Sequence, residues 1–179
     1  EGGSIESDGK GTLLTTSECL LSPNRNGAWN KDQIEQYLKE NLGISRILWL
    51  DHGFLEGDDT DSHIDTLARF CPNDTITYIQ CNDPKDHDYK ALKDMESQLQ
   101  SFRTQDNRRF RLLPLPMADE IVFDNERLPA TYANFLIING AVLYPTYNQP
   151  IKDSRTAEIL TTAFPERQII GIDCRALIK

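Results

Sequence analysis

The sequence has few cysteines and no long apolar run, and each absence excludes a class of protein. Its 4 cysteines lie far apart without a C-x-x-C pair, which excludes a small disulfide-stapled domain and favours free thiols in a reducing compartment. No apolar run approaches the length of a membrane span, and no basic start precedes an apolar core as in a signal peptide. We therefore predict a cytoplasmic protein with no membrane partner.

Basic residues are scarce relative to acidic ones, with 19 Lys and Arg against 28 Asp and Glu and a net charge of -9. This charge repels phosphate backbones and anionic lipid, so nucleic acid is excluded as the expected partner and cationic ligands are favoured. The remaining composition, 39% hydrophobic and 26% charged over 179 residues, is typical of a globular domain with one sizeable core.

Three turn signals recur at intervals of about 65 residues: Asp8-Gly9, residues 72–74 and Asn139-Gly140. Each lies between two runs of strand type and is followed by a segment of helical period and one more strand. The predicted hairpin strands are residues 4–7 with 12–17, 63–70 with 75–81, and 132–138 with 141–145. The predicted helices are residues 31–42, 88–104 and 154–163, and the closing strands are residues 46–50, 109–115 and 168–173. Repetition of a ββαβ unit predicts a pseudosymmetric α/β fold.

The first helix has the clearest predicted boundaries. Asn30 precedes it as N-cap, Gln33 stands three residues later in capping-box position, and Gly43 follows its last residue. Its apolar stripe comprises Ile34, Tyr37, Leu38 and Leu42. The corresponding stripe of the second helix comprises Leu92, Met95, Leu99 and Phe102.

Residues 57–65, called the acidic segment below, carry four carboxylates and one imidazole. Carboxylates crowded together repel one another unless a cation, a proton or a cationic ligand offsets them. The segment therefore indicates a site for a positive group, and His63 supplies a proton carrier near neutral pH. It ends a long non-periodic connection, residues 51–62, of the kind on which sites are commonly built.

His63 and Asp65 are two residues apart, so an extended backbone would direct both side chains to the same face of a sheet. This predicts an acid or base beside a carboxylate. The alternative is a surface strand on which both side chains are solvated.

A cation loop is the competing interpretation of Asp58, Asp59 and Asp61, because carboxylates on a turn suit calcium. The spacing disagrees with it, since a calcium loop that starts at any of these residues lacks the Gly expected at its sixth position.

No cysteine is a strong candidate nucleophile, because Cys174 has no histidine near it in the sequence. Asn134, within an apolar run, must find hydrogen-bond partners if it is buried.

Several motifs recur in a recognisable order along the whole chain, and the acidic segment is the most specific of them. They are residues 1–5 with 8–12, residues 58–65, residues 132–135 with Asn139-Gly140, residues 164–167, and residues 171–173 with Arg175. In this order they resemble the agmatine deiminase family, which is related to bacterial peptidylarginine deiminases and belongs to the guanidino-group-modifying superfamily.

The resemblance implies the pentein fold, an α/β propeller of ββαβ units, of which this chain would hold about three of five. The units would be residues 1–50, 51–116 and 117–179. The chain would then be the C-terminal portion of one catalytic domain, without the domain's N-terminal part. This implication agrees with the repeat found from the turn signals.

The resemblance also implies a hydrolysis without metal or cofactor, in which a Cys thiolate attacks the guanidinium carbon of agmatine. Ammonia leaves, and water releases N-carbamoylputrescine, a step toward putrescine and the polyamines. Asp59 and Asp65 would bind the guanidinium nitrogens, and His63 would protonate ammonia and then activate water. Glu1 and Asn134 would line the pocket.

Three departures from the family pattern stand out. A further guanidinium-binding Asp of the family belongs to an upstream Trp-x-Arg-Asp motif that this sequence lacks. The family's nucleophilic Cys lies in a Gly-rich segment roughly a dozen residues beyond the position of Asp173, and the sequence ends at Lys179. This chain alone is therefore expected to be inactive. Ser62 stands where the family usually has Gly.

Three alternatives remain at this point. One is a peptidylarginine deiminase, which forms citrulline and differs in what the pocket accepts beyond the guanidinium. Another is an inactive fragment, and the third is a domain that binds a cation without catalysis. The family resemblance also suggests a homodimer.

Overall fold

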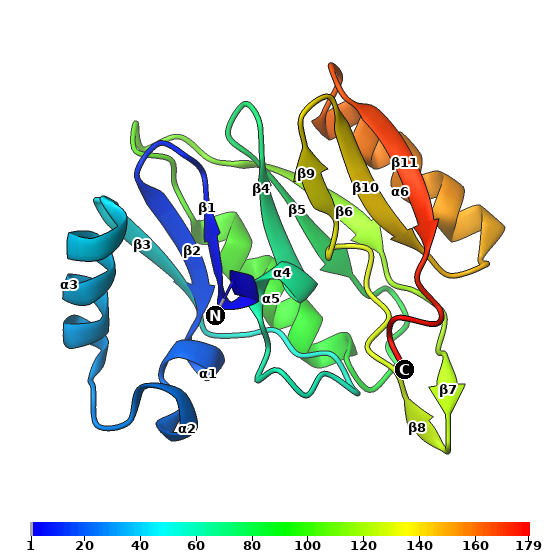
Figure 1. The fold of residues 1–179 in the computed structure, drawn as a ribbon, viewed down its shortest axis with the longest axis horizontal. Helices are drawn as coiled ribbons and strands as arrows, with labels where there is room; N and C mark the ends of the chain where they lie inside the picture. Colours follow the sequence, from blue (N-terminus) through cyan, green and yellow to red (C-terminus); the bar gives the residue numbers. More distant parts are fainter. Residues whose placement is uncertain (1) are drawn as a thin grey trace.

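The computed structural model describes residues 2–179 and is built around three similar three-stranded sheets (Figure 1). The first unit contains η1 (Gly2–Ser4), β1 (Ile5–Ser7), β2 (Thr12–Thr16), α1 (Ser17–Leu20), α2 (Pro23–Asn26), α3 (Lys31–Leu42) and β3 (Arg46–Leu50). The second contains α4 (Ile64–Leu67), β4 (Ala68–Cys71), β5 (Thr75–Gln80), α5 (Tyr89–Ser101) and β6 (Arg111–Pro116). The third contains β9 (Leu136–Ile138), β10 (Ala141–Thr146), α6 (Pro150–Ala163) and β11 (Gln168–Asp173). A separate two-stranded hairpin, β7 (Val122–Phe123) and β8 (Glu126–Arg127), lies between the second and third units in the chain.

All three sheets share one topology. The strand orders are β1-β2-β3, β4-β5-β6 and β11-β10-β9, with an antiparallel hairpin followed by a parallel third strand. A parallel third strand requires a crossover, which α3, α5 and α6 supply. The ββαβ repeat expected from the sequence is therefore present three times in the described chain.

Local sequence signals explain the elements that match their predicted bounds. Asn30 and Gln33 form a complete capping box at the start of α3, and Gly43 ends the helix in a left-handed conformation with φ 64°. The closing strands β3 and β11 also have their predicted ends. Capping and turn chemistry act within a few residues, so the sequence alone can specify them.

The strand predicted for residues 63–70 is wrong in its first half. Residues 64–67 form helix α4, and the strand begins only at Ala68. Ile64 and Leu67 are both 0% exposed. Their spacing of three buries both on one side of a helical turn, whereas alternation would place them on opposite faces of a strand.

The third unit shows two further differences from the prediction. Residues 132–135 precede β9 rather than belong to it, although Tyr132 is fully buried. Helix α6 begins at Pro150, four residues before its predicted start at residue 154. Proline suits the first turn of a helix, and the Asp153 carboxylate accepts hydrogen bonds from the backbone N–H groups of Tyr147 and Gln149.

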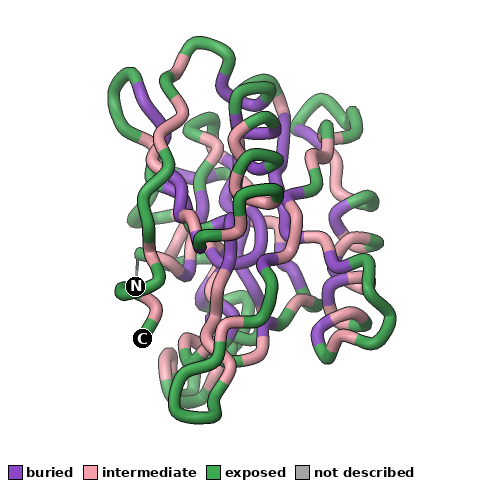
Figure 2. Tube along the Cα trace, turned by 90° about the vertical axis from the view of Figure 1, so that its right-hand side faces the viewer, coloured by how far each residue is buried: buried purple, intermediate pink, exposed green. Residues whose placement is uncertain are grey.

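The helices join neighbouring units. Helix α6 packs against β6 of the preceding sheet as well as against β10 and β11 of its own. Gln98 of α5 donates to the backbone oxygen of Trp49 at 3.0 Å and accepts from Asp51 N at 2.8 Å. Figure 2 shows buried segments concentrated inside and exposed loops around them. None of the described helices is long and apolar enough to span a membrane.

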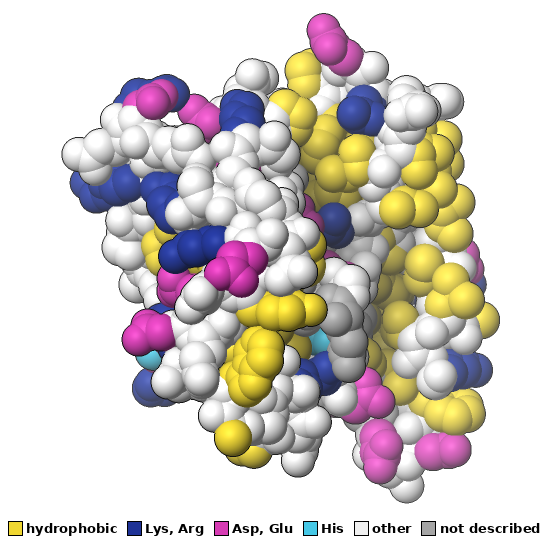
Figure 3. All heavy atoms as spheres, turned by 60° about the vertical axis from the view of Figure 1, so that its left-hand side comes forward, with side chains coloured by type: hydrophobic (Ala, Val, Ile, Leu, Met, Phe, Trp, Pro, Cys, Tyr) yellow, Lys and Arg dark blue, Asp and Glu magenta, His cyan; other side chains and the backbone are white. Residues whose placement is uncertain are grey.

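Part of the apolar surface remains exposed. In the stripe predicted for α3 only Ile34 is buried, whereas Tyr37 is 51% and Leu42 49% exposed. Leu136 and Ile138 of β9 are exposed as well. The space-filling view in Figure 3 shows apolar side chains gathered on one side of the molecule. Exposed apolar surface of this kind is typical of contact faces.

Candidate active site

The acidic segment enters α4 through a constrained loop. Asp61 and Ser62 both have left-handed backbone conformations, with φ values of 58° and 57°. The Thr16 hydroxyl donates to the backbone oxygen of Ser62 at 2.8 Å. Arg25 donates to the backbone oxygen of Thr60 at 2.7 Å and to the Asp61 carboxylate at 3.1 Å. Contacts from the first unit therefore hold the outer side of this loop.

Asp58 organises the inner side of the same loop. Its Oδ1 accepts hydrogen bonds from both the backbone N–H and the hydroxyl of Thr60. Its Oδ2 is buried and has no hydrogen-bond partner among the described residues. A buried carboxylate oxygen without a partner is costly and is characteristic of functional sites.

His63 and Asp65 lie together at the start of α4. A Cβ placed on Gly3 would come within 2.7 Å of His63 Nδ1 and 2.8 Å of Asp65 Oδ2, so both side chains lie against this one glycine. The predicted proximity of the pair is present, but its predicted cause is wrong. The two side chains converge from a helix start rather than from one face of a strand.

Burial raises the pKa of Asp65, whereas the charges of Arg69 and His63 oppose this shift, and the like charge of Asp58 adds to it. A carboxylate that is partly desolvated in this way gains more from a cation than a solvated one does. The charges of Asp58 and His63 therefore act on the ionisation of Asp65.

Arg69 connects all three units beside this pair. Its Nε is 2.8 Å from Glu6 Oε2, and its Nη1 donates to the backbone oxygen of Phe135 at 2.7 Å. Its guanidinium also lies 4.9 Å from the centre of the Phe135 ring. The Arg69 and Glu6 side chains are only 14% and 11% exposed. The ion pair joins the first unit to the second, and the hydrogen bond to Phe135 joins the third unit to the second.

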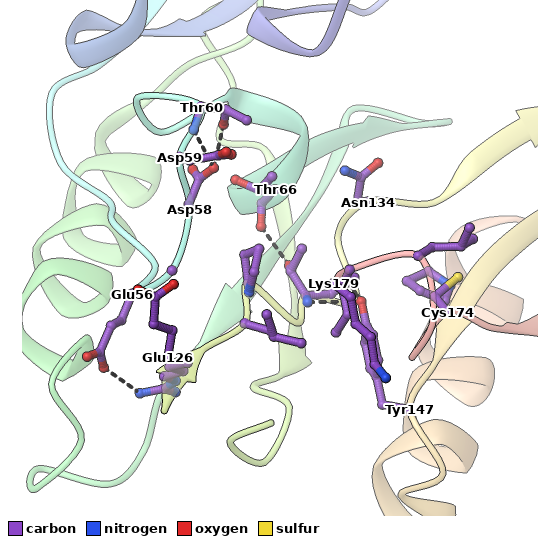
Figure 4. Close-up of a pocket in the computed structure, with 18 of the residues that line it drawn as sticks. Glu56, Asp58, Asp59, Thr60, Thr66, Glu126, Asn134, Tyr147, Cys174 and Lys179 are labelled. Carbon is purple, nitrogen blue, oxygen red and sulfur yellow. Dashed lines mark hydrogen bonds and ion pairs between the residues drawn. The ribbon is translucent and has the colours of Figure 1, made fainter. Parts of the chain in front are cut away.

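A cavity of about 910 Å³ opens next to the acidic segment, and Figure 4 shows its walls. Asp58 and Asp59 lie on one wall, and Asn134 and Cys174 lie on the opposite one. The residues that line it do not include His63 and Asp65. The structure therefore brings Asp59 and Asn134 to one cavity and His63 and Asp65 to an adjoining position. Glu1 lies outside the described residues.

Hydrogen bonds between threonines and a tyrosine join the Asn134 wall to α4. The Thr131 hydroxyl donates to the backbone oxygen of Thr66 at 2.6 Å. Tyr147 donates its hydroxyl to Thr131 O at 2.9 Å and accepts from Thr131 N at 3.0 Å. Asn134 itself is exposed at the cavity, so its amide is accessible to a ligand there.

Three of the described cysteines are poor nucleophiles in this environment. Burial raises the pKa of Cys71 to about 11, and it also raises the pKa of Cys81. Cys174 lines the cavity, but burial and then the charge of Asp173 raise its pKa as well. An activated thiol requires a lowered pKa, so these positions support the expectation that the nucleophile is none of them.

Among residues 2–179, one group of side chains could offer ligands to a metal. Donor atoms of Glu56, His87 and Asp88 lie within 4.8 Å of one another. Arg127 already supplies positive charge there, at 3.3 Å from Glu56 and 3.9 Å from Asp88. Asp58, Asp59 and Asp61 form no such group in the described chain. The described residues therefore offer the calcium interpretation of the acidic segment no set of converging side-chain ligands.

A family profile for Porphyromonas-type peptidyl-arginine deiminase matches residues 1–179. The chain belongs to this family. The resemblance to the agmatine deiminase and peptidylarginine deiminase families is thereby confirmed.

Solved structures and curated proteins of this family resemble the chain throughout its length. A candidate arginine deiminase from Porphyromonas gingivalis is 54% identical, with a TM-score of 0.97, over 100% of this chain and 52% of its own. A Cys-to-Ser variant of C. jejuni agmatine deiminase with substrate bound is 44% identical, with a TM-score of 0.93, over 99% of this chain and 51% of its own. A curated candidate agmatine deiminase from Vibrio parahaemolyticus is 38% identical over 99% of this chain and 54% of its own. The chain spans about half the length of the curated relatives it matches.

The backbone at position 62 is left-handed, a conformation that would suit the glycine expected there from the resemblance. Ser62 adopts φ 57° and is only 4% exposed. Glycine reaches this region without the steric cost that a Cβ brings. Ser62 therefore adopts this conformation at a small cost in stability.

Arg69 and Glu6 belong to this site but were not predicted from the sequence. Each stands inside a short strand, with Ala68 and Phe70 flanking Arg69. The available signal was a charge of each sign within two short strands. Sequence alone could not pair them, because they are separated by 63 positions.

Proposed function

We propose that this chain is part of an agmatine deiminase, which hydrolyses the guanidino group of agmatine to N-carbamoylputrescine and ammonia. The observation that carries the proposal is an uncompensated group of acids beside an imidazole. Asp58 and Asp59 have no cationic partner among the described residues, and Asp65 adjoins His63. Such a site suits a small cation with more than one positive group.

In this mechanism Asp65 binds the guanidinium and orients its carbon for attack by a cysteine thiolate. The carbon–nitrogen bond breaks as His63 protonates the departing ammonia. Water, deprotonated by His63, then attacks the S-linked amidino carbon, and the thiolate is released with the carbamoyl product. A relative's structure, solved with substrate in a Cys-to-Ser variant, supports a cysteine in this role.

The nucleophile would come from outside the described cysteines, and the complete protein would be a propeller of five units. The present three sheets and their shared topology support this architecture. The chain alone would then bind substrate weakly and release no ammonia. Activity must therefore be measured on the complete protein.

The decisive experiment measures ammonia release from agmatine by the complete protein and by His63→Ala. We expect the variant to lose activity by a factor of about a thousand or more, because it lacks the proton carrier. His87→Ala is the matched control, since the His87 side chain is 68% exposed and belongs to a different loop. Full activity of His63→Ala would contradict the proposal.

Peptidylarginine deiminase is the second candidate, because the matching family profile carries that description. Comparing the turnover of agmatine with that of a blocked arginine peptide separates the two. Asp59 lies exposed on the cavity wall and has two possible assignments. If it binds the guanidinium, as the resemblance implies, Asp59→Asn lowers turnover of both substrates. If it binds the distal ammonium, only the KM for agmatine rises.

Two further expectations remain predictions. A homodimer would double the mass of the complete protein in sedimentation equilibrium. A cytoplasmic location would place it with the soluble fraction after cell fractionation.

A further inference from the structure

Threonines fix the backbone of His63 on both sides. The His63 N–H donates to Thr60 Oγ1 at 3.3 Å. Its backbone oxygen accepts from Thr66 N at 3.2 Å and from the Thr66 hydroxyl at 2.8 Å. Because these bonds fix the peptide groups on either side of the His63 Cα, they limit the directions in which its imidazole can point.

Asp58 determines which way the Thr60 hydroxyl points. A hydroxyl has a single proton, and that of Thr60 goes to Asp58 Oδ1, which also accepts from Thr60 N at 3.0 Å. The oxygen of the same hydroxyl is then available to accept from His63 N–H. Asp58, Thr60 and His63 thus form a hydrogen-bonded relay with a defined direction.

The relay spans the strained part of the loop. Between Thr60 and His63 the chain passes through Asp61 and Ser62, both left-handed. Non-glycine residues in this region are disfavoured by about 1 kcal/mol each, so they persist only where surrounding contacts hold them. Arg25 and Thr16 hold this stretch from the first unit, whereas the relay holds it from within.

We propose that Asp58 is a positioning residue of the active site, which fixes His63 through Thr60 and acts on Asp65 by its charge. The proposal rests on the deiminase function proposed above. It assigns Asp58 a role that the sequence indicated only as support for the loop.

The electrostatic part of the role follows from the buried carboxylate. Asp58 Oδ2 has no hydrogen-bond partner in the described chain, so part of its charge is not neutralised locally. The charged groups that act on Asp65 are His63 and Asp58 from the acidic segment, Arg69 from β4 and Glu6 from β1. Burial raises the pKa of Asp65, Arg69 and His63 lower it, and Asp58 raises it.

The two parts of the role affect different kinetic quantities. A cationic substrate binds ionised Asp65, so kcat/KM falls as the pH falls through the pKa of Asp65. Removing the charge of Asp58 lowers that pKa and moves this acid limb to lower pH. Removing the relay instead misorients His63 and lowers kcat at every pH.

The test measures kcat and kcat/KM for agmatine across pH in the complete protein and four variants. Asp58→Asn keeps an acceptor oxygen but loses the charge, so we expect the acid limb to move to lower pH and kcat to fall less than it does in Thr60→Val. Thr60→Val keeps the charge but breaks the relay, and we expect kcat to fall about tenfold with the limb unmoved. Thr60→Ser should restore kcat. Asp61→Asn is the matched control, because it removes a carboxylate of the same loop that pairs with Arg25.

Amide hydrogen exchange at His63 gives a second readout that needs no activity. Thr60→Val should exchange this amide faster than the parent protein and Thr60→Ser. The proposal is overturned if folded Thr60→Val has the same kcat and the same amide exchange rate at His63 as the parent protein. It is also overturned if the acid limbs of Asp58→Asn and Asp61→Asn lie at the same pH. If Thr60→Val does not fold, the limb of Asp58→Asn decides. A parent protein inactive on agmatine and on arginine peptide would instead refute the proposed function, and exchange would still test the relay.

Discussion

Two loops of this protein are crowded with carboxylates, and they differ in which of those carboxylates pair with a cation among the described residues. In residues 83–88, Asp86 and Asp88 lie near Arg127, which also contacts Glu56, and we call these four residues the Arg127 cluster. In the acidic segment, Arg25 pairs with Asp61, but Asp58 and Asp59 have no ion pair in the described chain. The comparison teaches that density of acid alone does not mark a binding site. The acidic segment is distinguished by Asp58 Oδ2, a buried oxygen without a hydrogen-bond partner in the described chain.

The largest predicted effect comes from removing the cation of the Arg127 cluster. Arg127→Ala leaves Asp88, which is 1% exposed, without its cation. We expect the free energy of unfolding to fall by about 3 kcal/mol, because an unpaired buried charge is costly. Urea denaturation at pH 7 measures the change, and Arg127→Lys should recover part of it. A loss below about 1 kcal/mol would mean that the backbone N–H of Glu56 and the His87 ring hold Asp88 without Arg127.

A cationic ligand should stabilise the protein through the acidic segment and not through residues 83–88. In the complete protein, agmatine at one hundred times its Kd should raise the free energy of unfolding by about 2.7 kcal/mol, because it binds only the native state. Asp65→Asn should lose most of this stabilisation, whereas Asp86→Asn should keep it. Thermal denaturation with and without agmatine measures both. Equal responses of the two variants would remove the distinction between the loops.

The same two substitutions should have opposite effects on the free protein. Burial raises the pKa of Asp65. Burial would also raise the pKa of Asp86, but hydrogen bonds from Asp88 N and Arg127 outweigh it and leave that pKa lowered. Ionised Asp65 therefore costs stability above its raised pKa, and this cost disappears below the unfolded value of about 3.9. Ionised Asp86 contributes stability above about 3.9, which is lost as the pH falls through its lowered pKa.

At pH 7 we therefore expect Asp65→Asn to raise the free energy of unfolding by less than about 1 kcal/mol, and Asp86→Asn to lower it by a similar amount. Urea denaturation at pH 7 and at pH 3 checks the signs and their convergence in acid. Destabilisation of the free protein by Asp65→Asn would contradict the view that the site keeps a costly charge for its ligand.

The smallest predicted effect concerns backbone strain, which also distinguishes the loops. Asp61 and Ser62 are left-handed, whereas no residue from 83 to 88 has a positive φ in the described structure. Ser62→Gly should raise the free energy of unfolding by about 0.5 kcal/mol, because glycine relieves the strain but adds entropy to the unfolded chain. Ser62→Val should lower it by more than about 1 kcal/mol. A stabilising Ser62→Val would show that the loop is not strained.

Much of the repeat was predictable because its signals are local. The turns at Gly9 and Gly140 need positive φ, which glycine supplies, and the capping box of α3 uses residues three positions apart. Helix α4 was not predicted, because Ile64 and Leu67 fit a strand or a helical turn equally well until the core that buries them is known. Pairing with Arg25 or Arg127 was not predictable either, since each lies far along the chain from its partners.

The sequence by itself determined the ββαβ repeat, the excess of acid and the group of residues, His63, Asp65, Asp59 and Asn134, in which to look for a site. Backbone preference and hydrogen bonding between near neighbours are sufficient for that. Only the tertiary structure decided which acids remain without a cation, which glycine faces His63 and Asp65, and that Arg69 joins three units beside them. Charge compensation and desolvation depend on which distant segments meet, and packing of the three units determines that.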